Sequence, residues 1–267
     1  MNFNEELRRL QIKRDGSLKI DRSKKIDYPP VMLSIGETML GQTTYPIPFG
    51  TYGNFSVLKG GTKVGKSHFK SLLIASYIGG KANNYSSNFK SHRLGDLAIL
   101  DFNTEEGEWH AQMGAKRVDT IVGETYENYH PFMLRELDYN ERLDFLEYEI
   151  FTKYKNQVGL IIIDGIADLV ADVNSLAESN EMVQKLMSWS TLSKAHISVV
   201  IHTNFGSNKA TGHLGSAVEK KAETVCQLER EDSFTKVTFP FCRGFKIDDF
   251  CFKLDQYGLP YTDKLDY

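Results

Sequence analysis

The segment from Gly60 to Ser67 has the residue types and the spacing of a loop that binds phosphate groups. It reads Gly-Gly-Thr-Lys-Val-Gly-Lys-Ser, which satisfies the pattern G-x-x-x-x-G-K-S/T in full. The glycines let the backbone curve so that its N–H groups point at phosphate oxygens. Lys66 is placed to reach the β- and γ-phosphates, and Ser67 to bind Mg²⁺ through its hydroxyl. The segment therefore predicts a site for ATP and Mg²⁺, and the residues expected to surround the phosphates are Gly60, Gly61, Thr62, Lys63, Val64, Gly65, Lys66, Ser67 and His68.

The segments on either side of this loop support the prediction. Residues 54–58 are typical of a short strand, and residues 66–78 have apolar side chains at helical spacing. A strand, a loop and a helix in this order place bound phosphates at the amino end of the helix, where free N–H groups and the helix dipole favour anions. The alternative is a solvated turn that is merely rich in Gly and Lys, and it does not account for these flanking elements.

Acidic residues follow two other predicted strands. Glu105 comes just after the strand at 97–102, where it is placed to take a proton from an attacking water or to orient that water. Its neighbour Glu106 is a rival for this role. Asp164 ends the apolar run at 158–163, which is typical of a central parallel strand. We expect Asp164 to hold the water shell of Mg²⁺, and the alternative is an Asp that only begins a turn.

A histidine and a polar loop follow the predicted strand at residues 197–201. His202 is placed to sense the γ-phosphate and to report it to the next loop, although a lone His is as often satisfied by local partners. That loop, residues 204–216, is rich in Gly and polar residues, and Lys220 and Lys221 come after it. Backbone amides and lysines suit contact with a nucleic-acid backbone, so we expect single-stranded DNA here. A plain surface loop is the alternative.

The composition limits the class of protein. The chain has 267 residues, is 41% hydrophobic and 25% charged, and has a net charge of −3, as expected for one α/β domain with a sizeable core. Because there is no overall basic field, contact with nucleic acid requires a local patch. The cysteines lack C-x-x-C spacing and the histidines lack metal-ligand spacing, which argues against a zinc ribbon or a disulfide framework. No apolar run approaches the length of a membrane span and no signal peptide is evident, so we expect a cytoplasmic protein with no membrane contact.

Strands that alternate with helices predict the fold class. The pattern indicates an α/β protein whose mostly parallel sheet has helices on both faces and binds its ligand at the carboxyl ends of the strands. We expect an edge strand at 31–35, a polar surface loop at 79–96 and a helix at about 139–156. Phenylalanines that alternate with other residues over 236–242 and 250–254 predict a C-terminal antiparallel hairpin.

The chain divides into a basic N-terminal arm, residues 1–30, and one ATPase domain, residues 31–267. The arm is rich in Lys and Arg and ends at two prolines. Asn4 is placed to cap a short helix that reaches Ile12. We expect the arm to be either a solvated tail or a contact for DNA or a protein partner.

The motifs and their order resemble the RecA-like P-loop ATPases. Within that class the chain is similar to the AAA_25 and RepA-helicase-like ATPases, in particular to versions on Bacteroidetes mobile elements and phages. The resemblance covers about residues 31–260. The segments that carry it are Gly53–Ser56, Lys63–Ser67, Asn103–Glu105, Ile163–Leu169, His202–Asn204, Gly212–Gly215 and Lys221–Thr224.

The resemblance implies an ATPase whose subunits complete one another's sites in a ring, as in a homo-hexamer. In RecA-like hexameric helicases an arginine after the penultimate strand reaches the γ-phosphate of the neighbour, and Arg243 matches that place. Such helicases often carry a basic residue two positions earlier, where this chain has Phe241. The expected function is an ATP-driven motor on DNA, a helicase for replication or mobilisation. The alternatives are a recombinase or strand-annealing ATPase of the same fold, and a regulatory or assembly ATPase that binds protein and not DNA.

Overall fold

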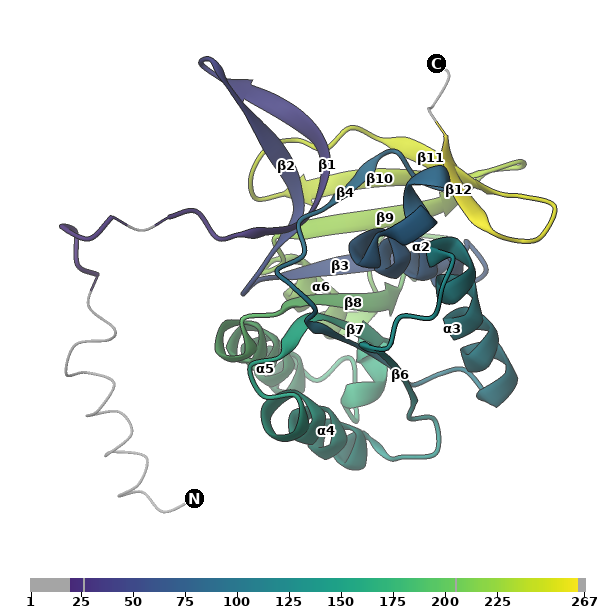
Figure 1. The fold of residues 1–267 in the computed structure, drawn as a ribbon. Coiled ribbons are helices and arrows are strands. Elements are labelled where there is room, and N and C mark those ends of the chain that lie inside the picture. The colour runs from purple at the N-terminus through teal and green to yellow at the C-terminus, as the bar shows by residue number, and fades with distance from the viewer. Residues whose placement is uncertain (1–19, 26, 205, 264–267) are drawn as a thin grey trace.

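A computed structural model describes residues 20–25, 27–204 and 206–263, which form two β-sheets with helices packed on them (Figure 1). The strands of the larger, nine-stranded sheet are β3 (Phe55–Gly60), β5 (Ala98–Asn103), β6 (Tyr129–Met133), β7 (Val158–Asp164), β8 (His196–His202), β9 (Thr224–Arg230), β10 (Thr235–Cys242), β11 (Phe250–Leu254) and β12 (Pro260–Asp263). The smaller sheet contains β1 (Val31–Leu40), β2 (Thr43–Thr51) and β4 (Phe89–Ser91).

Helices cover both faces of the larger sheet. The α-helices are α2 (Lys66–Ile78), α3 (Glu108–Val122), α4 (Tyr139–Tyr148), α5 (Leu176–Ser193) and α6 (Gly212–Glu219). Short turns of other helix types are η1 (Gly80–Asn84), η2 (Glu149–Lys153) and η3 (Ile166–Leu169). One core packs α2, α3 and the smaller sheet against one face, and a second core packs α4, α5 and α6 against the other. None of the helices in the described residues is long and apolar enough to cross a bilayer.

The order of strands in the larger sheet is β12-β11-β10-β9-β3-β8-β7-β5-β6. The six strands from β9 to β6 are parallel, and β10 to β12 are antiparallel. This arrangement confirms the predicted mostly parallel sheet with helices and a C-terminal antiparallel hairpin. The strands β5 and β7 are buried along their whole length, which explains why most of their residues are apolar.

The register of the parallel strands brings the residues predicted to form the site to the carboxyl edge of the sheet. Gly60 at the end of β3 pairs with His202 at the end of β8, and Asn103 at the end of β5 pairs with Asp164 at the end of β7. Since β8 lies between β3 and β7, the phosphate loop, His202 and Asp164 follow adjacent strands. The carboxyl ends of these strands meet where an α/β sheet binds its ligands.

The smaller sheet corrects two predictions. Residues 31–35 were expected to form an edge strand, but β1 is the central strand of the smaller sheet, between β2 and β4. Residues 79–96 were expected to be a surface loop, but they contain η1 and β4. Phe89 of β4 packs against aromatic rings from both sheets and from α2, so the segment belongs to the core.

The structure also corrects the bounds of one predicted helix and one predicted loop. The helix expected at 139–156 is α-helical only to Tyr148 and continues as a π-helical turn to Lys153. The loop expected at 204–216 ends earlier, because α6 begins at Gly212 and buries Leu214 against the second core. In the N-terminal arm, residues 20–25 and 27–30 are exposed and form neither helix nor strand. The helix expected from Asn4 to Ile12 lies outside the described residues.

Candidate active site

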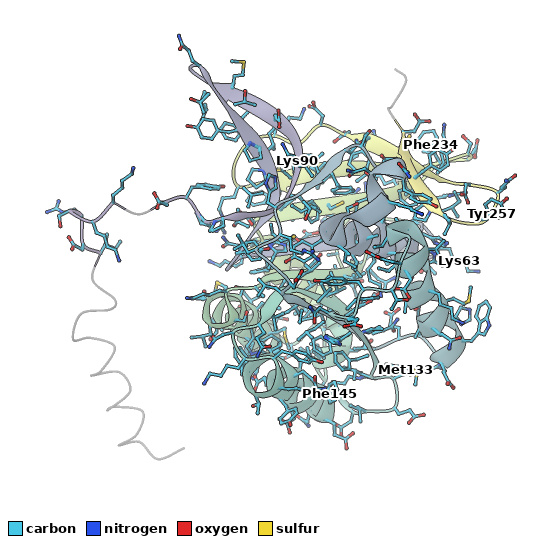
Figure 2. The ribbon with its side chains drawn as sticks, viewed as in Figure 1. Lys63, Lys90, Met133, Phe145, Phe234 and Tyr257 are labelled. Carbon is cyan, nitrogen blue, oxygen red and sulfur yellow. The ribbon has the colours of Figure 1, made fainter. Side chains whose placement is uncertain are left out.

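An open cavity of about 870 Å³ lies at the carboxyl edge of the parallel strands. Its volume falls within the usual range for ligand pockets, about 300–1,000 Å³. The predicted phosphate loop and helix contribute Lys63, Gly65, Lys66, Ser67 and His68. The strand ends contribute Asn103, Glu105, Glu106, Asp164 and His202. Figure 2 labels Lys63 and Met133, which line the cavity from the phosphate loop and from β6.

The backbone of the loop requires glycine where the chain turns into α2. Gly65 has a φ of 93°, a left-handed conformation, and a Cβ there would lie 2.9 Å from the ring of Phe252. No side chain in the described residues caps the amino end of α2, and its first turn has no acidic residue. The free N–H groups and the helix dipole at this end therefore favour an anion.

The remaining residues of the predicted phosphate loop contact its neighbours or solvent and do not point into the cavity as charged groups do. Gly60 and Gly61 offer their carbonyl oxygens to Lys66, and Thr62 is exposed. The side chain of Val64 is buried in the core, and its carbonyl accepts a hydrogen bond from Thr235. These residues shape the loop.

Lys66, His202 and Glu105 form a connected chain. The Lys66 Nζ donates to the carbonyls of Gly60 and Gly61, at 3.0 and 2.7 Å, and lies 3.1 Å from His202 Nδ1. The other ring nitrogen of His202 lies 3.2 Å from Glu105 Oε1. The hydrogen bond with His202 lowers the pKa of Glu105 despite partial burial, so Glu105 is ionised near neutral pH. Burial lowers the pKa of Lys66, and the charges of Glu105 and Asp164 oppose that shift.

Glu106 contacts the hydroxyl of Ser67. The Ser67 Oγ donates to Glu106 Oε1 at 3.1 Å, and the Asn103 amide nitrogen donates to Glu106 Oε2 at 2.7 Å. The amide oxygen of Asn103 accepts from the backbone N–H of Glu106 at 2.9 Å and from that of Glu105 at 3.2 Å. Asn103 therefore fixes the turn that separates the two glutamates, one toward Ser67 and the other toward His202.

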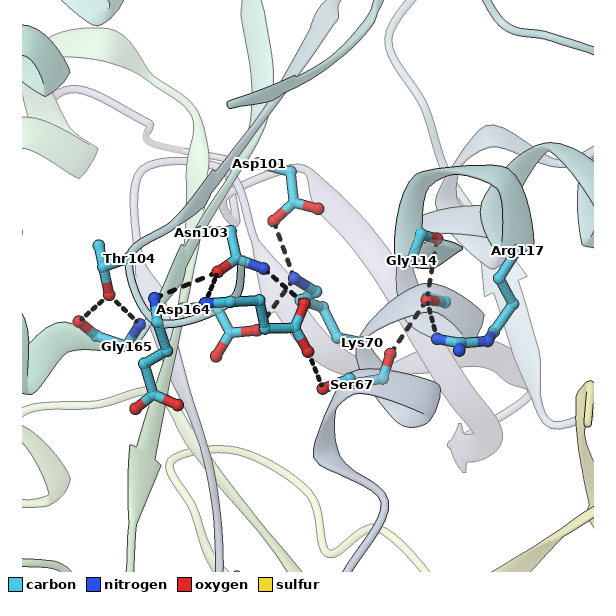
Figure 3. Close-up of polar contacts among 12 residues, drawn as sticks. Ser67, Lys70, Asp101, Asn103, Thr104, Gly114, Arg117, Asp164 and Gly165 are labelled. Atoms are coloured by element: carbon cyan, nitrogen blue, oxygen red, sulfur yellow. Dashed lines mark hydrogen bonds and ion pairs between the residues drawn. The ribbon is translucent and has the colours of Figure 1, made fainter. Parts of the chain in front are cut away.

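Asp164 is held by a lysine that the sequence analysis did not single out. The Lys70 Nζ lies 2.9 Å from Asp164 Oδ2 and 3.3 Å from Asp101 Oδ1 (Figure 3). The other oxygen of Asp101 accepts from the hydroxyl of Tyr129 at 2.9 Å. Burial alone would lower the pKa of Lys70, but the two carboxylates outweigh it and raise that pKa, so the ammonium stays charged. Removing one partner of a buried pair typically costs about 3–5 kcal/mol, so this cluster also fastens α2 to β5 and β7.

A signal for this cluster is present in the sequence. Asp101 interrupts an otherwise apolar buried strand, and Lys70 lies on α2 among the buried residues Phe69 and Leu72. A charged residue on each of two buried elements indicates a pair, because an unpaired buried charge is very costly. Neither residue belongs to the phosphate-loop pattern, which is why the motif did not find them.

Two arginines that the sequence analysis did not name, Arg117 and Arg230, line the cavity. Burial, together with the nearby charges of Arg117 and Arg230, lowers the pKa of His68 to about 4. His68 is therefore neutral at pH 7. The two guanidinium groups add positive charge to a cavity predicted to bind a polyanion.

Arg243 does not lie in the cavity of its own chain. It follows Cys242, which pairs with Thr224, and Thr224 pairs with Ser56 near the amino end of β3. The phosphate loop follows the opposite end of β3. Arg243 is exposed, and its guanidinium donates to the carbonyl of Lys221 at 3.1 Å. Arg243 is therefore not part of the cavity of its own chain.

The oxygen atoms at the amino end of α2 fit Mg²⁺ bound together with phosphates. The hydroxyl of Ser67 and the carboxylates of Glu106 and Asp164 line the cavity and offer hard oxygen atoms, the kind that Mg²⁺ prefers. In the residues that the structure describes, no group of three or more His, Cys, Asp or Glu side chains is placed to hold a metal ion. Mg²⁺ usually needs only one or two carboxylates, because nucleotide phosphates and waters complete its shell.

The chain matches no protein-family model, and no curated protein matches it. The resemblance to RecA-like ATPases therefore stays a prediction that rests on the motifs and their order.

Proposed function

We propose that this protein hydrolyses ATP in the presence of Mg²⁺. The observation that carries the proposal is the complete phosphate loop at the carboxyl edge of the sheet, with Lys66 connected through His202 to Glu105. The ammonium of Lys66, the imidazole of His202 and the ionised carboxylate of Glu105 all line one cavity. These are the components that hydrolysis of a phosphoanhydride bond requires.

Each residue has a distinct part in the proposed reaction. The N–H groups of the loop and the Lys66 ammonium bind the β- and γ-phosphates, and a γ-phosphate oxygen replaces the carbonyls that Lys66 now contacts. Ser67 and an acidic partner would hold Mg²⁺, which when bound would neutralise charge on the phosphates. Glu105 orients the attacking water and accepts its proton, while His202 positions the carboxylate.

Replacing Glu105 by glutamine is expected to keep ATP bound and to lower hydrolysis about a hundredfold or more, because an amide does not accept the proton of the water. The measurement is the ATPase rate at saturating ATP, with ATP binding determined separately. Glu136→Gln is the matched control, because it removes an exposed carboxylate outside the cavity. If Glu106→Gln abolishes turnover without weakening metal binding while Glu105→Gln stays active, the base is Glu106.

We further propose that the ATPase acts on DNA as a replicative or mobilisation helicase of a mobile element or phage. This step is supported by the resemblance and by the polar segment at 206–211, which follows His202 by a few residues. Lys59 ties the segment to β3, because its ammonium donates to the carbonyl of Asn208 at 2.9 Å and pairs with Glu219 at 2.7 Å. Nucleotide-dependent movement at His202 would thus reach a loop suited to a DNA backbone.

Single-stranded DNA is expected to raise the ATPase rate, because DNA bound at the loop stabilises the state that hydrolyses ATP. The measurement compares rates with and without DNA and the mass of the protein under the same conditions. Unwinding of a duplex separates a helicase from a recombinase or strand-annealing ATPase. A rate that single-stranded DNA leaves unchanged would favour the regulatory or assembly ATPase.

A further inference from the structure

We propose that Glu106, and not Asp164, is the carboxylate that binds the Mg²⁺ of the nucleotide, because the Lys70 ammonium already occupies Asp164. This inference rests on the proposed function and assigns the metal ligands of the same site. It departs from the expectation, based on strand order, that the acid at the end of β7 serves the metal.

The first step is the state of Asp164. Its Oδ2 lies 2.9 Å from Lys70 Nζ, and the side chains of Lys70 and Asp164 are only 6% and 13% exposed. In such surroundings opposite charges interact much more strongly than in water, so the pair is not readily exchanged for a solvated ion. The ammonium also repels a divalent cation. A metal that approached Asp164 would have to displace or tolerate a fixed positive charge.

The second step is the position of Glu106. Its Oε1 is 3.1 Å from the Ser67 hydroxyl, the group expected to bind the metal. No corresponding bond joins Ser67 to Asp164 in the described residues, where the Asp164 carboxylate pairs with Lys70. A metal ion bound to Ser67 Oγ is therefore within reach of Glu106, with only a small adjustment of the hydroxyl–carboxylate pair.

The third step is how Glu106 is held. The amide nitrogen of Asn103 donates to Oε2 at 2.7 Å, which leaves Oε1 directed at Ser67. The amide oxygen of Asn103 also accepts a hydrogen bond from the backbone N–H of Glu106. Asn103 therefore holds both the backbone and the carboxylate of Glu106. Support of this kind orients metal-binding carboxylates, and its loss typically costs about 10–100-fold in metal affinity.

The three carboxylates thus divide their tasks. Glu106 binds the metal, and Glu105 orients the attacking water and accepts its proton. Asp164 is a positioning residue that holds Lys70 and, through it, α2 against the sheet. Figure 3 shows Lys70 between Asp101 and Asp164, and Ser67 on the neighbouring turn of the same helix.

The test is metal binding and not turnover. Free Mn²⁺ is titrated by electron paramagnetic resonance against the protein saturated with ADP, and ADP binding without metal is measured in parallel. Glu106→Gln is expected to weaken Mn²⁺ binding about tenfold or more, in line with the loss of a metal ligand. The same variant should bind metal-free ADP as the unchanged protein does. Asp164→Asn should bind Mn²⁺ more tightly than Glu106→Gln, and Glu136→Gln is the control.

A second variant covers the case in which Asp164→Asn does not fold. The double change Lys70→Met and Asp101→Asn removes one buried positive and one buried negative charge and leaves Asp164 free. Added to Glu106→Gln, it is expected to restore part of the Mn²⁺ affinity, since a free Asp164 then takes the metal.

Either of two results would overturn the inference: Asp164→Asn loses Mn²⁺ while Glu106→Gln retains it, or the freed Asp164 restores nothing. A different result marks failure of the proposed function. In that case the unchanged protein binds neither ADP nor ATP, with or without metal, and the inference falls with it.

Discussion

Replacing Lys66 by alanine is expected to abolish ATP hydrolysis and to weaken ATP binding strongly. Hydrogen bonds to charged groups contribute about 1.5–3 kcal/mol each, so the loss of the ammonium corresponds to roughly ten- to a hundredfold in affinity. Turnover falls further, because the charge is also needed where negative charge develops on the transferring phosphoryl group. The protein should stay folded, since the Lys66 ammonium contacts two loop carbonyls and a half-exposed histidine and not the buried core.

The measurements are ATP affinity, the ATPase rate and a thermal melting curve of the same preparation. Lys90→Ala is the matched control, because it removes an exposed lysine whose ion pair with Glu37 lies outside the cavity. Normal turnover by a folded Lys66→Ala protein would show that the loop does not bind the reacting phosphates.

Replacing Arg243 by alanine is expected to leave ATP binding nearly intact and to lower turnover about 10³-fold, the contribution of an arginine finger supplied by a neighbouring subunit. Arg243 lies at the sheet edge opposite its own phosphate loop and is exposed, so it has no access to the cavity of its own chain. The effect therefore requires assembly. Lys246→Ala, an exposed cation in the same segment, is the control.

An experiment that mixes two inactive variants tests whether the arginine acts on a neighbouring subunit. Arg243→Ala protein combined with Lys66→Ala protein should regain part of the activity, because some interfaces then pair an intact loop with an intact arginine. Turnover per subunit should also rise with protein concentration as subunits associate. Turnover independent of concentration, with no gain on mixing, would reject both the finger and the ring, and Arg230 in the cavity would become the arginine to test.

The elements that could be predicted from the sequence have strong periodicity or a motif. The helix expected at residues 66–78 has those bounds as α2, and Asp164 ends β7 as expected. The aromatic alternation correctly predicted the pairing of β10 with β11. These segments bury most of their residues in a regular pattern, so hydrophobicity alone reports their structure.

Elements with a mixed surface were missed. Only three residues of α3 are buried, Val118, Ile121 and Val122, all in its second half, so the helical period is weak over most of its length. In β6, Pro131 and alternating exposure obscure the strand. β4 has only three residues and depends on pairing with β1. Each is defined by its neighbours in space more than by its own sequence.

The candidate site was predictable as far as the motif and the strand ends extend. Lys66, Ser67, Glu105, Asp164 and His202 do meet in one cavity. The partners could not be assigned, because they depend on which side chains of separate segments come within bonding distance. The pairing of Lys70 with Asp164, of Glu106 with Ser67 and of Glu105 with His202 joins residues that are 39 to 97 positions apart in the chain.

The place of β3 in the sheet sets the order in which the protein assembles. β3 pairs on one side with β8 and on the other with β9, and both strands come far later in the chain. At a typical synthesis rate of about 5–20 residues per second, β3 waits roughly 10–30 s for the end of β9 to leave the ribosome. Because pairing between such distant segments is slow, the centre of the sheet forms late. The nascent chain thus carries the loop at 60–67 for most of its synthesis without the strands that shape it.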